Sequence, residues 1–115
     1  MPPLSITSQI LEDTVTLVVS GDIDLGNAEG LYKALTDALA PGRPVIVDLT
    51  GVGFMDSRGF AALVRAHHEA AHGVSVPILV IPSDPVARVF ELAGADGVLP
   101  TYRDHAEALA ALTAS

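Results

Sequence analysis

Cysteine is absent from this 115-residue sequence, and phenylalanine and tyrosine together make up only 4% of it. Without cysteine, the chain has no disulfide scaffold, no thiol nucleophile and no cysteine-based zinc site. Half of the residues are nevertheless apolar. We therefore expect a core built mainly of valine, leucine, isoleucine and alanine. The length suits one domain covering residues 1–115.

Basic residues and long apolar segments are also scarce. Six basic residues stand against fourteen acidic ones, which gives a formal net charge of −8. Such a chain is repelled by phosphate backbones and anionic lipid, so the charge argues against nucleic acid and membrane surfaces as partners and favours a basic protein surface. No apolar run approaches the ~20 residues that span a bilayer. The N-terminus MPPLSITSQ lacks the blocks of a signal peptide, so we expect a cytoplasmic protein.

Hydrophobic periodicity divides the chain into short alternating elements. Apolar residues alternate with polar ones in two stretches separated by Glu12-Asp13, which predicts a hairpin. Leucines at intervals of four predict a helix that ends at Pro41-Gly42. Two continuous apolar runs predict strands covered on both faces. The expected strands lie within 4–20 and at 44–49, 76–81 and 97–100, and the expected helices at about 31–39, 58–73 and 83–94 and from 104 onward.

The resulting order, β-β-α-β-α-β-α-β-α, predicts the fold class. Buried strands that alternate with helices are typical of an α/β domain with a mixed, mainly parallel sheet, here with an N-terminal β-hairpin and about four helices. Three residues are expected to cap helices, namely Asn27, Asp84 and Asp104. Asp104 is followed three residues later by Glu107, as in a capping box.

The sequence offers little for an enzyme. A hydrolase elbow needs glycine two residues on either side of its serine, and the upstream glycine is missing around Ser57. His67 lies on an apolar helical stripe, where a core position is the better interpretation. His68 and His72 share one helix face, but no third metal ligand accompanies them.

Two phosphate-related alternatives are weak as well. Residues 50–54, TGVGF, are glycine-rich but lack the lysine and spacing of a P-loop, so a plain turn is favoured. Asp48 near the end of a buried strand resembles a phosphoaspartate position. The only lysine, Lys33, belongs to the first helix, so no lysine after a late strand would neutralise an acyl phosphate.

The corner GFMDSRGF, 53–60, holds the most informative residue, Ser57. One interpretation is structural: Ser57 caps the helix that begins near Arg58, and Asp56 favours the positive end of the helix dipole. The other is that a partner kinase phosphorylates the exposed hydroxyl. The free N–H groups of the helix end would then accommodate the phosphate, while the added charge would weaken a partner's docking.

Residues 45–66, VIVDLTGVGFMDSRGFAALVRA, resemble the signature of STAS domains, in particular of anti-sigma factor antagonists. Residues 20–24, SGDID, resemble the same family's Gly-Glu/Asp-hydrophobic-Asp stretch. The spacing between the two motifs and the order of elements match the family along essentially the whole chain.

The resemblance implies a small α/β domain that captures an anti-sigma factor and thereby frees a sigma factor. The partner is typically an ATP-binding serine kinase of the histidine-kinase-like ATPase type, and it would inactivate the domain by phosphorylating Ser57. A serine phosphatase would restore binding. The domain itself would supply no catalysis and hold no cofactor, because the ATP and its metal belong to the kinase.

The resemblance also implies a docking surface and leaves alternatives open. Many relatives carry a second small hydroxyl residue where this chain has Arg58, which would pair with Asp56, aid partner recognition, hold the phosphate, or mark a member with a different kinase or no phosphorylation. A scaffold subunit of a stress-signalling complex, or a small-ligand or nucleotide sensor, is the alternative function, and a small serine hydrolase or metalloenzyme is a remote one. The expected partner-binding residues are Asp22, Asp24, Phe54, Met55, Asp56, Ser57, Arg58 and Gly59.

Overall fold

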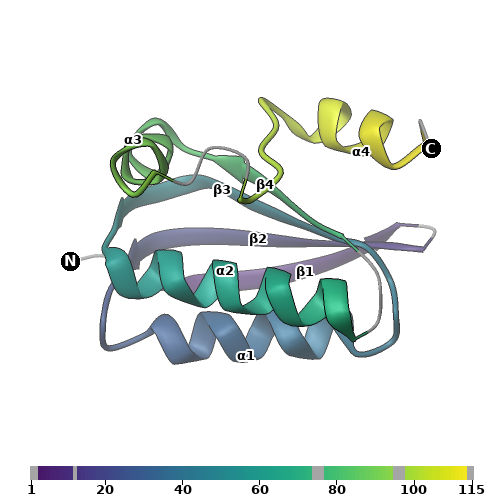
Figure 1. Ribbon diagram of the computed structural model, residues 1–115, viewed down its shortest axis with the longest axis horizontal. Helices are drawn as coiled ribbons and strands as arrows, with labels where there is room; N and C mark the ends of the chain where they lie inside the picture. The colour runs from purple at the N-terminus through teal and green to yellow at the C-terminus, as the bar shows by residue number, and fades with distance from the viewer. Residues whose placement is uncertain (1–2, 12, 74–76, 95–97, 114–115) are drawn as a thin grey trace.

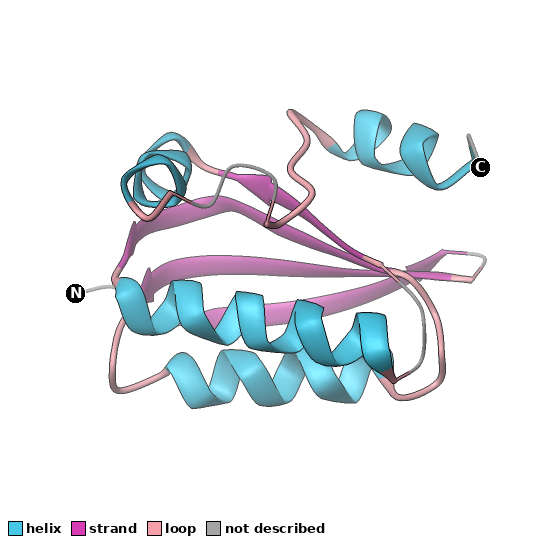
Figure 2. Cartoon of the chain, in the orientation of Figure 1, coloured by secondary structure: helices cyan, strands magenta, loops and turns pink. Residues whose placement is uncertain are grey.

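The structure is a computed structural model that describes residues 3–11, 13–73, 77–94 and 98–113, with the side chains of 71, 72 and 113 left out. Figure 1 shows the arrangement of the elements, and Figure 2 colours them by type. In chain order they are β1 (Ser5–Leu11), β2 (Thr14–Ile23), α1 (Ala28–Leu39), β3 (Val45–Met55), α2 (Ser57–His72), β4 (Ile78–Pro82), α3 (Asp84–Leu92) and α4 (His105–Thr113).

The four strands form one mixed sheet in the order β1-β2-β3-β4. β1 and β2 are antiparallel neighbours, and Leu11 pairs with Thr14 across the hairpin corner. The β2–β3 and β3–β4 pairs are parallel. An α/β domain with a mainly parallel sheet and an N-terminal hairpin is therefore confirmed, although Glu12 of the predicted corner lies outside the described residues.

Helices cover both faces of this sheet. α1 and α2 lie side by side against one face (Figure 1) and contribute Leu31, Leu35 and Leu63, all fully buried, to the main core. Side chains alternate along a strand, so the opposite face of β3 and β4 presents a second apolar cluster. That cluster contains Ile46 and Ala108, and α4 packs on it.

α3 closes the core beside β3. β4 pairs with β3 only as far as Leu49, so the rest of β3 lacks a strand partner on that side. α3 packs there, and its Phe90 ring lies 5.4 Å from that of Phe60 on α2, measured between centroids. The Ser83 hydroxyl donates a hydrogen bond to the Val52 carbonyl at 2.7 Å, which ties the start of α3 to β3.

The helix caps differ from the predictions in two of three cases. Ser83, not Asp84, is the N-cap of α3, because the Ser83 hydroxyl accepts the Val86 N–H and Asp84 is already helical. Asn27 occupies the N-cap position of α1, yet its side chain makes no capping bond. The Asp104 cap of α4 is confirmed, since its carboxylate accepts the Glu107 N–H at 2.8 Å.

Two strands also differ from their predicted lengths. β3 extends through 50–54 to Met55, so the glycine-rich TGVGF is a strand and the predicted turn is wrong. Its Gly51 and Gly53 pack closely beside β2, where added β-carbons would contact Ser20 and Asp22. The predicted strand at 97–100 is absent from residues 98–100, and a single bridge joins Thr101 to Val80 instead. Gly97 lies outside the described residues.

Candidate functional site

Asp56 caps helix α2 and defines the corner that the sequence singled out. One of its carboxylate oxygens accepts the N–H groups of Arg58 at 2.9 Å and Gly59 at 3.2 Å. The Asp56 N–H in turn donates to the Ile23 carbonyl at 3.1 Å, which joins the end of β2 to the start of α2. Of the two interpretations of Ser57, the one in which it caps the helix is therefore wrong, because Asp56 is the cap and Ser57 is the first helical residue.

Ser57 is left exposed and without a structural task. Its hydroxyl makes no hydrogen bond to any of the described residues, unlike the Ser83 hydroxyl at the corresponding end of α3. Two exposed apolar side chains are found on the segments that meet at this corner: Phe54 is 47% exposed and Leu25 is 65% exposed. A corner that exposes both a free hydroxyl and two apolar side chains is suited to a protein partner.

Two of the predicted docking residues are buried and do not belong to that surface. Met55 is only 2% exposed, because alternation along β3 turns it into the core while Phe54 faces outward. Gly59 is buried as well, and a β-carbon there would lie 2.5 Å from Cγ2 of Ile23. Both residues pack the first turn of α2 onto the core in this conformation.

Two aspartates border the corner, Asp22 near the end of β2 and Asp24 just after that strand, and both are half-buried. Asp22 pairs with Phe54 across the β2–β3 ladder. The Asn27 side chain accepts the Asp24 N–H at 2.9 Å and donates to the Asp22 carbonyl at 2.8 Å. Instead of capping α1, Asn27 therefore fixes the end of β2 and the residue after it, which carry the two carboxylates.

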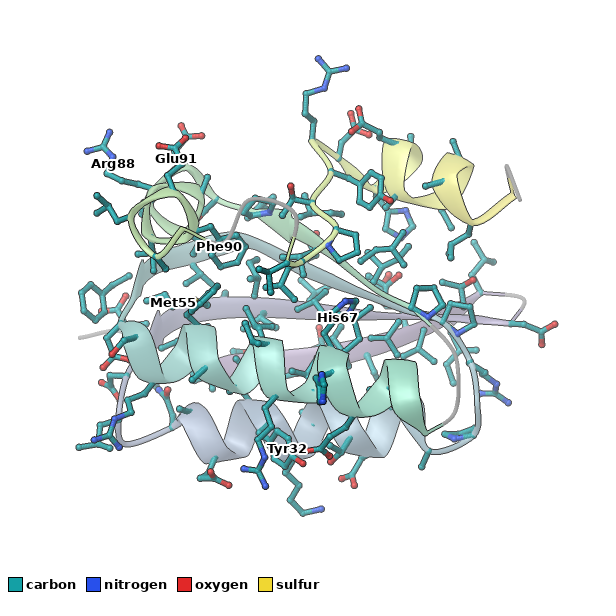
Figure 3. The ribbon with its side chains drawn as sticks, in the orientation of Figure 1. Tyr32, Met55, His67, Arg88, Phe90 and Glu91 are labelled. Carbon is teal, nitrogen blue, oxygen red and sulfur yellow. The ribbon has the colours of Figure 1, made fainter. Side chains whose placement is uncertain are left out.

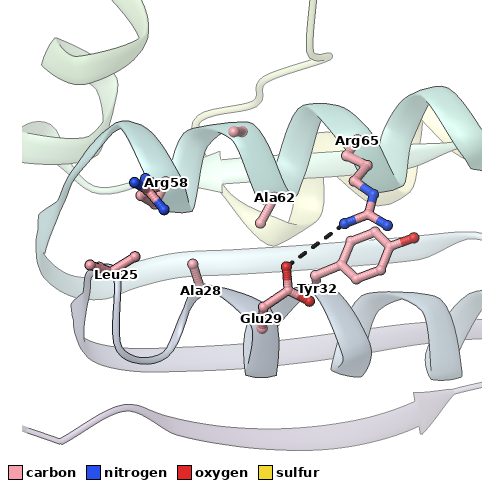
Figure 4. A pocket seen from close by; sticks show the side chains of 8 residues that line it. Leu25, Ala28, Glu29, Tyr32, Arg58, Ala62 and Arg65 are labelled. Carbon is pink, nitrogen blue, oxygen red and sulfur yellow. Dashed lines mark ion pairs between the residues drawn. The ribbon is translucent and has the colours of Figure 1, made fainter.

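A shallow groove of about 170 Å³ separates α1 from α2 beside the corner (Figure 4). Arg58 and Leu25 line it nearest the start of α2, and small side chains form much of the rest. Toward its other end, the Arg65 guanidinium lies 4.0 Å above the centre of the Tyr32 ring. The residues that line the groove are Leu25, Ala28, Glu29, Tyr32, Arg58, Ala61, Ala62 and Arg65.

The polar side chains along the groove are tied to one another. Arg65 pairs with Glu69 at 3.2 Å and approaches Glu29 at 3.8 Å. The Tyr32 hydroxyl donates to the Glu69 carboxylate at 2.6 Å, and this hydrogen bond raises the pKa of Tyr32. These contacts link α1 to α2 and leave Arg58 as the groove cation without a described ion-pair partner.

The enzyme alternatives gain no support from the described residues. Ser57 and His67 lie ten positions apart on one helix, about 15 Å along its axis, too far for a nucleophile–base pair. His67 is half-buried (Figure 3), and its burial lowers its pKa, as does the neighbouring His68. Its Nδ1 is buried and has no hydrogen-bond partner among the described residues.

The described residues form neither a metal site nor a phosphoaspartate site. Within the described residues, no three histidine, aspartate or glutamate side chains gather as metal ligands, and the His72 side chain lies outside them. Asp48 accepts hydrogen bonds from the backbone and hydroxyl of Thr50, while Lys33 pairs with Asp37 on α1.

Among the described residues, no helix has the length and apolar character needed to cross a membrane.

Comparison with known protein families gives a match: the family model of the STAS domain covers residues 5–108. The chain is a STAS domain.

Two curated relatives of this STAS domain carry regulatory names. The Mycobacterium tuberculosis protein Rv2638, named as an anti-anti-sigma factor, is 39% identical over 87 residues, which cover 71% of this chain and 57% of the relative. The anti-sigma-B factor antagonist of Listeria monocytogenes is 31% identical over 76% of this chain and 77% of its own.

Solved structures agree with the STAS fold. An anti-sigma factor antagonist from Mycobacterium paratuberculosis superimposes with a TM-score of 0.82 at 24% identity, covering 95% of this chain and 93% of its own. The Bacillus cell-fate determinant SpoIIAA, solved in its phosphorylated form, gives a TM-score of 0.64 at 19% identity over 96% of this chain and 99% of its own. At these identities the structures establish the fold alone.

The predicted site residues thus separate into three groups in this STAS domain. Phe54, Ser57 and Arg58 are exposed at one corner, and Asp22 and Asp24 at the end of β2 border it. Asp56 holds the helix start, while Met55 and Gly59 lie beneath it. Sequence reasoning missed Leu25, which directly follows the SGDID motif and whose exposure only the fold reveals.

Proposed function

We propose that this STAS domain is an anti-sigma factor antagonist, which binds an anti-sigma factor and so releases a sigma factor, and that phosphorylation of Ser57 switches it off. The observation that carries the proposal is the exposed Ser57 hydroxyl, which is not used for capping and lies at a corner whose segments also expose Phe54 and Leu25. The names of the mycobacterial and Listeria relatives support the partner class. SpoIIAA, solved in a phosphorylated form, supports the modification.

The partner would be a serine kinase of the histidine-kinase-like ATPase type, acting in the cytoplasm. The Ser57 oxygen attacks the γ-phosphorus of ATP, an O–P bond forms, and the bond from that phosphorus to the bridging oxygen breaks. ADP departs with the electron pair, and the hydroxyl proton passes to a base of the kinase. ATP and its metal ion come from the kinase, this domain contributes only the acceptor, and a serine phosphatase reverses the step.

The docking surface follows from exposure. It comprises Leu25, Phe54, Ser57 and Arg58, with Asp22 and Asp24 at its border. When a partner covers the apolar side chains there, their burial stabilises the complex by roughly 25 cal/mol for each Å² of apolar area. The two aspartates favour a basic surface on the partner, in agreement with the acidic net charge of −8.

Leu25→Asp tests this surface. We expect the substitution to abolish capture of the anti-sigma factor from extract of the source cells, because it places a charge where the partner buries an apolar side chain. Leu11→Asp is the matched control, since Leu11 is 66% exposed at the hairpin end of β1, opposite the end of β2 that adjoins the Ser57 corner. Captured proteins are identified by mass spectrometry. Equal capture of an ATP-binding anti-sigma factor by both variants would place the docking surface elsewhere.

Capture of an anti-sigma factor by the wild-type domain tests the proposed function itself. If the wild-type domain retains no anti-sigma factor of the ATP-binding kinase class, the proposed function is wrong. Stable self-assembly into a large complex, or nucleotide binding by the isolated domain, would then favour the scaffold or sensor function.

A further inference from the structure

We propose that the Arg58 guanidinium, and not the open end of helix α2, holds the phosphate once Ser57 is phosphorylated. This inference rests on the proposed phosphorylation and deepens it, because it assigns a role to the residue by which this chain departs from many relatives. It concerns the phosphorylated state itself, and therefore it is tested without any partner protein.

The end of α2 is already occupied by an anion. Free N–H groups at a helix start normally attract a phosphate. Here the Asp56 carboxylate accepts the N–H groups of Arg58 and Gly59, at 2.9 and 3.2 Å, and the Asp56 carbonyl accepts that of Phe60 at 3.2 Å. A phosphate on Ser57 would have to displace a carboxylate that is in place before it arrives. The sequence-based expectation that the helix end receives the phosphate loses its physical basis.

The surroundings of Ser57 are otherwise negative. Asp56 precedes it directly, and Asp22 and Asp24 lie at the end of β2, which joins the corner through the hydrogen bond from Asp56 to Ile23. Glu29 lines the groove that adjoins the start of α2. A phosphoserine adds a charge of about −1.5 to −2 at neutral pH, so its formation is opposed by each of these carboxylates. A nearby cation is needed to offset the repulsion.

Arg58 is the cation best placed to do so. It adjoins Ser57 in the first turn of α2, its side chain is exposed, and it has no ion-pair partner among the described residues. Three other cations are engaged elsewhere: Lys33 with Asp37, Arg65 with Glu29 and Glu69, and Arg103 with Glu107.

The remaining two cations lie elsewhere in the fold. Arg43 precedes β3, whereas Ser57 follows the opposite end of that strand. Arg88 lies on α3, on the side away from α1 and α2 (Figure 3). The planar guanidinium of Arg58, on a flexible stem, is well suited to two parallel hydrogen bonds with phosphate oxygens.

The test measures the charge around the phosphate directly. Phosphoserine is incorporated at position 57 by genetic encoding, and the second phosphate pKa, ordinarily near 6, is read from a ³¹P NMR titration. We expect Arg58→Gln to raise this pKa by about 0.7, as removal of one charge at roughly 4 Å in water implies. Asp56→Asn removes a negative charge and keeps a capping oxygen, so it should lower the pKa. Arg58→Lys keeps the positive charge, so the phosphate pKa should stay close to that of wild type.

Arg88→Gln is the control, because it removes the same charge from a helix that does not carry Ser57. If Arg58→Gln moves the phosphate pKa no further than Arg88→Gln does, Arg58 does not hold the phosphate and the inference is wrong. Amide spectra of each variant confirm that it is folded. Since encoded phosphoserine requires no kinase, this outcome stands apart from the capture experiment, which tests the proposed function.

Discussion

Ser57→Asp is expected to weaken binding of the anti-sigma factor by two to three orders of magnitude, while Ser57→Ala binds like wild type. The new carboxylate joins Asp56 at the start of α2 and faces a partner that must desolvate it when it covers Phe54 and Leu25. A loss of about 3 to 4 kcal/mol in binding free energy corresponds to this drop in affinity. Isothermal titration calorimetry with the captured partner gives both dissociation constants.

We expect Ser57→Asp to weaken binding through its position at the corner and not through the added net charge. Ser8→Asp provides the matched control, because Ser8 is an exposed serine on the edge strand β1. It adds the same charge to the same acidic chain and should leave the affinity within about threefold of wild type. Equal binding by wild type, Ser57→Ala and Ser57→Asp would show that charge at position 57 does not control docking.

Gly59→Ala is expected to lower the free energy of unfolding by about 1–3 kcal/mol, a typical result of overpacking. The added β-carbon would lie 2.5 Å from Cγ2 of Ile23 and 2.9 Å from Cγ of Met55, so the first turn of α2 has to move away from the core. The same displacement carries Ser57 with it. Urea denaturation followed by circular dichroism measures the loss.

Gly30→Ala separates this packing effect from helix propensity. Gly30 also lies within a helix, α1, but a β-carbon there meets nothing within 4 Å. Alanine is favoured over glycine in a helix by roughly 1 kcal/mol, so Gly30→Ala should stabilise the domain. If both alanine variants are stabilised to the same extent, close packing under Ser57 is not what requires glycine at position 59.

Local sequence patterns were sufficient for the order of elements up to α3 and for the helix α4. Leu31, Leu35 and Leu39 repeat at four-residue intervals, and all three are buried on α1. The continuous apolar runs became β3 and β4, whose paired segments are covered on both faces of the sheet. These features depend on neighbours along the chain, which is why periodicity predicts them.

The errors arose where distant segments decide the structure. Gly51 and Gly53 suggested a turn, yet they lie in β3 because β2 packs closely beside them. Asp56 and Ser57 are both good capping residues, and which of them begins the helix depends on the hydrogen bond from Asp56 to the Ile23 carbonyl of β2. Likewise, the burial of Met55 beside an exposed Phe54 follows from the sheet's register against the core, which no single motif encodes.

Phosphorylation of Ser57 by the captured anti-sigma factor tests the central claim most directly. Wild type and Ser57→Ala are each incubated with that partner, ATP and Mg²⁺, and intact masses and fragment spectra are recorded. The switch predicts that wild type gains one phosphoryl group, located on Ser57, and that Ser57→Ala gains none. Absence of any gain, or a phosphoryl group on another residue in both proteins, would contradict it and leave Ser57 as an ordinary exposed residue of the first helical turn.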